Sequence, residues 1–94
     1  MSVAESVAAS SVVDPLRFFV TDVTGQRRLE ETVDGHRTAE DVAMSMAEAL
    51  DLPTDTPWSL RDERRARMLL QGELLGSQVE PDAELVVIPQ AHLG

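Results

Sequence analysis

Cysteine and lysine are both missing from this chain of 94 residues. Without cysteine the chain can form neither a disulfide framework nor a thiol nucleophile. All eight basic residues are arginine, a bias that drift in a GC-rich genome would also produce. Whatever its origin, the bias leaves only the α-amine and the Ser and Thr hydroxyls as acceptors for an acyl group.

Positive charge is scarce, since 17 acidic residues face eight arginines and the formal net charge is −9. Affinity for nucleic acid depends on clustered Lys and Arg, so we expect neither nucleic acid nor an anionic membrane as a partner. The N-terminus has no basic and apolar leader, and no apolar run reaches membrane-spanning length. We therefore expect a soluble, cytoplasmic protein.

Motifs for catalysis and metal binding are also missing. His36 and His92 stand far apart without ligand spacing around them, and the acidic residues do not follow a calcium-loop pattern. Neither a glycine-rich phosphate loop nor a nucleophile elbow occurs. We expect no metal, no cofactor and no enzymatic activity.

The residues that are present predict one small domain. Residues 1–13 are rich in Ser, Ala and Val and predict a mobile tail, with a weak helix as the alternative. Residues 16–23 then alternate as a strand, with Leu16, Phe18 and Val20 on one face and Phe19, Thr21 and Val23 on the other. Gly25 predicts a hairpin turn into an antiparallel strand at 29–33. In that strand Glu31 shares the face of Leu29 and Val33, which buries a carboxylate unless a bulge turns it outward.

A helix is predicted after the hairpin, with Thr38 as its N-cap and Pro53 as its end. Its apolar face comprises Val42, Ala43, Met46, Ala49 and Leu50. Residues 58–62 then form a strand, residues 63–67 a charged turn and residues 68–70 a brief pairing. The arginines of that turn, Arg64, Arg65 and Arg67, are either simply solvated or meet an acidic partner.

The last strand runs through four β-forming residues, Leu85 to Ile88, and stops at Pro89. The residues after Pro89 are too few and too mixed for another element. This division gives a domain at 14–89 and a flexible C-terminal tail at 90–94.

Four segments carry a resemblance to ubiquitin: Phe18–Gln26 is similar to its first strand and turn, Thr38–Val42 to its helix start, Leu52–Asp55 to its proline loop, and Asp82–Gly94 to its last strand and tail. The resemblance covers about residues 16–94. It implies an α+β fold of the β-grasp (ubiquitin-like) type, a roll in which a mixed four- to five-stranded sheet packs on one helix. Gly94 falls where the conjugated terminal glycine of the family belongs.

The resemblance also implies a function. An activating enzyme would adenylate Gly94 with ATP, capture it as a thioester, and pass it through a conjugating enzyme to a protein target as an amide or ester. A deconjugating peptidase would reverse the linkage, and Ala91, His92 and Leu93 would be read as the tail. Leu93 replaces a glycine, and Gln90 and His92 replace arginines. These differences fit a bacterial modifier encoded with its own enzymes.

Alternation along the last strand sends Leu85 and Val87 to one face and Val86 and Ile88 to the other. We expect Val23, Val86 and Ile88 to form a surface for partner enzymes, unless the N-terminal tail covers them. If the modifier links to itself, the acceptors are the Met1 amine or the hydroxyls of Ser2, Ser6, Ser10 and Ser11.

Two other functions remain open. A sulfur carrier of the ThiS/MoaD type shares the fold and the activated glycine, but those families end in two glycines. An unconjugated ubiquitin-like adaptor, such as the small domains associated with type VII secretion, would not need Gly94.

Overall fold

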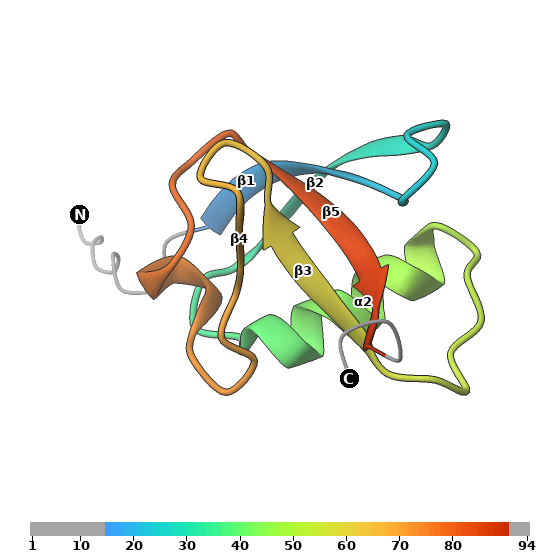
Figure 1. Ribbon diagram of the computed structural model, residues 1–94. Coiled ribbons are helices and arrows are strands. Elements are labelled where there is room, and N and C mark those ends of the chain that lie inside the picture. The colour runs from blue at the N-terminus through green and yellow to red at the C-terminus, as the bar shows by residue number, and fades with distance from the viewer. Residues whose placement is uncertain (1–14, 91–94) are drawn as a thin grey trace, which may run out of the picture.

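A five-stranded sheet with one helix across one of its faces forms the fold in the computed structural model, which describes residues 15–90 (Figure 1). The elements are β1 (Pro15–Thr21), β2 (Arg28–Asp34), α2 (Ala39–Ala49), β3 (Trp58–Asp62), β4 (Arg67–Met68), the short 3-10 helix η1 (Leu75–Ser77) and β5 (Ala83–Pro89). The strand order is β2-β1-β5-β3-β4. Strands β1 and β5 are parallel at the centre, and the other neighbours are antiparallel, so the sheet is mixed.

The hydrophobic core lies between the sheet and α2. Its largest fully buried side chains are Phe18, Val20, Val42, Leu50, Leu60, Leu75, Leu85 and Val87. Both central strands send alternate residues into this core and the intervening residues to the open face. The sheet therefore has one face covered by the helix and one face left open.

The first hairpin follows the predicted alternation. Leu16, Phe18 and Val20 are buried, and Gly25 adopts a positive φ of 75° in the turn. Strand β1 ends at Thr21, two residues before the predicted end, because Asp22 already belongs to the turn. Its carbonyl oxygen accepts the N–H of Gly25 at 3.0 Å.

Glu31 is neither fully buried nor turned outward by a bulge. It pairs directly with Phe18 in an unbroken β1–β2 register, and it is partly exposed. Strand β2 lies at the edge of the sheet, so a long side chain there can reach water past the margin of the core.

The helix begins as predicted, because the Thr38 hydroxyl accepts the backbone N–H of Asp41 at 3.2 Å. One member of the predicted apolar face is wrong. Ala49 is exposed, and Ala47 is buried in its place. Ala47 follows the fully buried Ala43 by four residues, which places it one turn along the same face and nearer its centre than Ala49.

The predicted end of the helix is also wrong. The last helical residue is Ala49, and Asp51 adopts a left-handed conformation with φ of 62°. The N–H of Asp51 donates to the carbonyl of Glu48 at 3.0 Å, and the N–H of Leu52 donates to that of Ala47 at 2.8 Å. These two bonds form a Schellman cap. The helix thus ends through its own cap, before Pro53.

In the second half of the sheet, the prediction from the sequence is accurate for β3 and less accurate for the neighbouring elements. Strand β3 has the predicted bounds, whereas β4 begins at Arg67, inside the predicted charged turn, and η1 is an unpredicted element. In β5, Leu85 and Val87 are buried and Val86 and Ile88 are partly exposed, as predicted. The strand also includes the buried Ala83, which was predicted to lie in the preceding turn. Pro89 is the last residue of β5.

Candidate functional site

The predicted conjugation tail continues from the end of β5. The N–H of Gln90 donates to the carbonyl of Pro57 at 2.9 Å, and Pro89 pairs with Trp58 of β3. The Trp58 indole N–H donates to the carbonyl of Pro53 at 2.6 Å. These contacts fix the point from which the chain continues toward Gly94. The structure describes the chain only to Gln90 at this end, so Ala91, His92, Leu93 and Gly94 lie outside the described residues, as do Ser2, Ser6, Ser10 and Ser11.

Two of the three residues predicted for the partner surface meet in one hollow on the open face. Val23, which is 60% exposed, and Val86 line a hollow of about 410 Å³. Its other lining residues are Thr21, Asp22, Thr24, Gly25, Arg61 and Glu63. Ile88 is the next outward residue of β5 and pairs with Ser59, and it does not line this hollow.

The hollow also holds an ion pair that sequence reasoning missed. Arg61 of β3 lies directly opposite Val86, and its guanidinium is 2.7 Å from the Glu63 carboxylate. Both side chains are partly exposed. The two valines therefore border a charged centre, and the surface can offer a partner apolar contact and polar pairing together.

Asp22 adds a second carboxylate at the rim of this hollow. The Thr24 hydroxyl donates to it at 2.7 Å, and this hydrogen bond lowers the pKa of Asp22. Asp22 is therefore more acidic than an ordinary aspartate. Asp22 also shapes the turn that carries Val23, so the same residue positions the exposed valine and contributes charge beside it.

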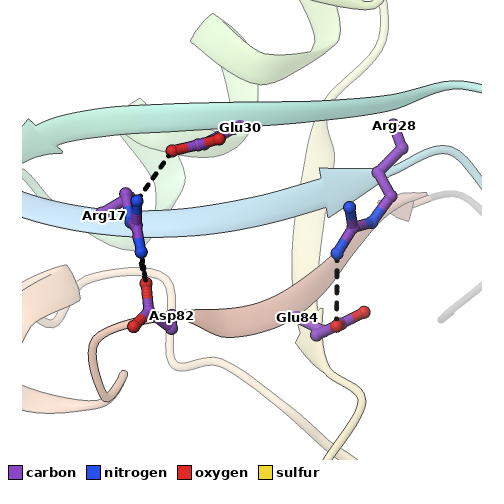
Figure 2. Close-up of polar contacts among 5 residues, drawn as sticks. All are labelled: Arg17, Arg28, Glu30, Asp82 and Glu84. Carbon is purple, nitrogen blue, oxygen red and sulfur yellow. Dashed lines mark hydrogen bonds and ion pairs between the residues drawn. The ribbon is translucent and has the colours of Figure 1, made fainter.

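Another cluster on the open face lies across β2, β1 and β5. Phe19 stands between Glu30 and Glu84 on the neighbouring strands, and the Arg28 guanidinium lies 4.2 Å from its ring centroid. Figure 2 shows Arg28 reaching Glu84, at 3.3 Å. The arrangement favours cation–π contact between Arg28 and the ring.

Arg17 completes this cluster by bridging two strands. Its guanidinium is 3.0 Å from the Glu30 carboxylate on β2 and 2.8 Å from that of Asp82, just before β5 (Figure 2). The hydrogen bond to Asp82 raises the pKa of Arg17. All of these side chains are about half exposed, so water screens the pairs and they contribute little to the stability of the fold. The outward position of Phe19 was the sequence signal for this cluster, and the sheet register then placed Glu30 and Glu84 beside it.

A second hollow, of about 440 Å³, lies where β1 begins. Its lining includes Pro15, Leu16, His36, Leu74 and Gly76, and none of the predicted site residues. His36 approaches the Asp34 carboxylate at 3.2 Å there, and the backbone N–H of His36 lowers the pKa of that carboxylate. This hollow is separate from the one that holds Val23 and Val86.

Within residues 15–90 there is no group of three or more His, Asp or Glu side chains that could hold a metal ion. In the same part of the chain, no helix is long and apolar enough to cross a membrane.

No family model and no curated protein matches the sequence. Solved structures do match the fold. Ubiquitin of Caldiarchaeum subterraneum is 23% identical with a TM-score of 0.65, and the match covers 81% of this chain and 94% of that chain. The UBL domain of Plasmodium falciparum Dsk2 is 14% identical with a TM-score of 0.64, over 81% and 99% of the two chains.

A chain from the toluene 4-monooxygenase HD complex with the inhibitor 4-bromobenzoate also matches, at 14% identity and a TM-score of 0.69, over 81% of this chain and 99% of that chain. Together these likenesses and the mixed five-stranded sheet on one helix define a ubiquitin-like β-grasp fold of the α+β class. The predicted fold class is therefore confirmed.

Proposed function

We propose that this chain is a ubiquitin-like protein modifier that is activated at Gly94 and joined to a protein target. The observation that carries the proposal is the ubiquitin-like fold, with the chain leaving its central strand β5 at Pro89 and Gln90. From Gln90 to Gly94 the sequence has the length of the ubiquitin tail that it resembles.

The proposed chemistry needs nothing from this chain except an acyl group. In an activating enzyme the Gly94 carboxylate attacks the α-phosphorus of ATP and releases pyrophosphate, which gives an acyl adenylate. The cysteine thiolate of the enzyme then displaces AMP to form a thioester. A conjugating enzyme accepts the acyl group and transfers it to an amine or hydroxyl of the target. Glycine suits this position because it has no side chain to obstruct a narrow channel.

The hollow with Val23 and Val86, together with Ile88, is the proposed surface for the activating and conjugating enzymes. It lies on the open face of β5, the same strand that leads into the proposed tail. One enzyme could therefore bind this surface and act on the tail at the same time. The ion pair of Arg61 and Glu63 in this surface would select partners able to satisfy both charges.

Self-linkage, where it occurs, would use unusual acceptors. The chain has no lysine, so the acceptors are the Met1 amine or hydroxyls such as Ser2, Ser6, Ser10 and Ser11. We propose an ester for oligomers formed through these serines. Hydroxylamine at mildly alkaline pH should release such oligomers, and oligomers that resist it are amides.

The test uses the full chain with a candidate activating enzyme, Mg-ATP and intact-mass analysis. We expect an enzyme-bound species that excess thiol releases by thioester exchange and that mild alkali then hydrolyses to unmodified chain, and we expect removal of Gly94 to abolish it. A Ser10→Ala variant serves as the control and should load normally. The proposal would be overturned if none of the activating enzymes encoded in the source genome formed a thioester with the chain.

The same experiment separates the two alternatives. If a sulfur donor such as sulfide is added, a sulfur carrier would be released as a thiocarboxylate, because the sulfur displaces AMP from the acyl adenylate. An unconjugated adaptor would never load, and removal of Gly94 would leave its cellular function intact. The adaptor alternative is supported by the likeness to the Dsk2 UBL domain.

A further inference from the structure

The turn between β3 and β4 carries arginines that lack the carboxylate partner most other arginines of the chain have. Five of the eight arginines, at positions 17, 28, 37, 61 and 65, form ion pairs with carboxylates, and Arg27 donates to the carbonyl of Leu50. Among residues 15–90, Arg64 and Arg67 have no carboxylate within ion-pair distance, although both are exposed. In a chain with 17 acidic residues, this turn therefore presents positive charge to the solvent.

The turn is held in shape by the fold. The buried Asp62 carboxylate accepts the backbone N–H groups of Arg64 at 3.0 Å and Arg65 at 3.3 Å. Arg65 is bonded to the Glu80 carboxylate and to the carbonyl of Gln78, and Ala66 adopts a left-handed conformation with φ of 54°. Folding has therefore already ordered this turn, so a partner that binds it would cause little further loss of conformational entropy.

An exposed apolar side chain lies close by in the chain. Leu70 is 66% exposed and follows Arg67 by three residues. Arg67 belongs to β4, and Leu70 follows that strand by two residues. Because β4 pairs over only two residues, an added strand would gain few backbone bonds, and side chains must supply the recognition.

We infer that the segment 64–70 is a docking surface for an acidic protein segment that carries an apolar side chain between its carboxylates. Arg64 and Arg67 would pair with the carboxylates, and Leu70 would contact the apolar side chain. This surface uses none of the residues of the hollow around Val23 and Val86, so the inference is independent of the proposed conjugation.

The test is a titration of the isotope-labelled full chain with the capped peptide Asp-Asp-Glu-Leu-Asp-Glu, followed by NMR. We expect amide shifts confined to residues 64–70 and their neighbours, which weaken as salt is added. The double variant Arg64→Gln/Arg67→Gln should lower the affinity roughly fivefold or more. A second peptide, with Ser in place of Leu, should bind the unchanged protein less tightly than the first peptide does. The Leu70→Ser variant should bind the two peptides with equal affinity.

The matched control is Arg17→Gln/Arg28→Gln, which gives the same net charge and should bind like the unchanged protein. Equal weakening by both double variants would mean nonspecific attraction and would overturn the inference. Concentration-dependent shifts of the same residues without peptide would also overturn it, because a second copy of the chain would then be the occupant.

Discussion

At the scale of single residues, several features of the fold depend on one side chain or on its absence. Gly76 is an example, since its N–H donates to the carbonyl of Gly35 at 2.8 Å. A Cβ at position 76 would lie 3.0 Å from that same oxygen, whereas a Cβ at Gly72 would meet nothing within 4 Å. The two glycines are close in sequence and differ in what surrounds them.

This difference predicts opposite effects for the same substitution. Gly76→Ala should lower the free energy of unfolding by about 1–3 kcal/mol, because two backbone segments must separate. Gly72→Ala should change it little or raise it by about 0.4–1 kcal/mol, by restricting the unfolded chain. Urea unfolding followed by circular dichroism measures both, and equal effects would contradict the assigned close approach.

Asp41 provides a residue-scale prediction about pH. The Arg37 guanidinium donates to it at 2.6 Å, and this bond lowers the pKa of Asp41 below the ordinary aspartate value of 3.8. A lowered folded pKa contributes stability that is present above the ordinary value and is lost as the pH falls through the folded value. In NMR titrations, Arg37→Gln should bring the pKa of Asp41 back toward the ordinary value, and Arg28→Gln should leave it unchanged.

At the scale of elements, alternation along β5 separates the residues that stabilise the fold from those available to partners. Leu85 is 1% exposed, whereas Val86, the next residue, is partly exposed on the open face. The two neighbouring side chains therefore have different surroundings although both are apolar.

We predict that Leu85→Ala lowers the free energy of unfolding by about 2–5 kcal/mol, because it leaves a cavity in the core. Val86→Ala should cost about 1 kcal/mol or less, since its surroundings are partly solvent. Chemical unfolding of the two variants makes the comparison. A larger cost for Val86→Ala would mean that the strand faces are assigned the wrong way round.

At the scale of the whole molecule, the fold brings together residues far apart in the chain. Val23 and Val86 are far apart in the sequence, yet they line the same hollow. They meet because β1 and β5 are parallel neighbours and Thr21 pairs with Val86. The proposed function depends on this arrangement.

Ile88→Asp tests the part of the proposed partner surface that lies beside this hollow on β5. We expect the variant to keep its fold, since Ile88 lies on the open face, and to bind the activating enzyme on the order of tenfold more weakly. Thr32→Asp places the same charge on the exposed outer side of β2 and should bind normally. Unchanged binding by a folded Ile88→Asp variant would remove this residue from the partner surface.

The division into a domain at 14–89 and two tails stays a prediction, because the residues that would decide it lie outside the described part of the chain. The proposed roles of Gly94 and of the tail stay predictions for the same reason.

Most local elements were predictable from the sequence, apart from the helix end, the start of β4 and the short helix η1. Alternation places Leu16, Phe18 and Val20 in the core, Thr38 caps the helix and β3 has its predicted bounds, because each depends on near neighbours along the chain. Only the tertiary structure decided which distant residues meet. It placed Arg61 opposite Val86 and buried Ala47 in place of Ala49, because strand pairing and helix packing are set by the whole core.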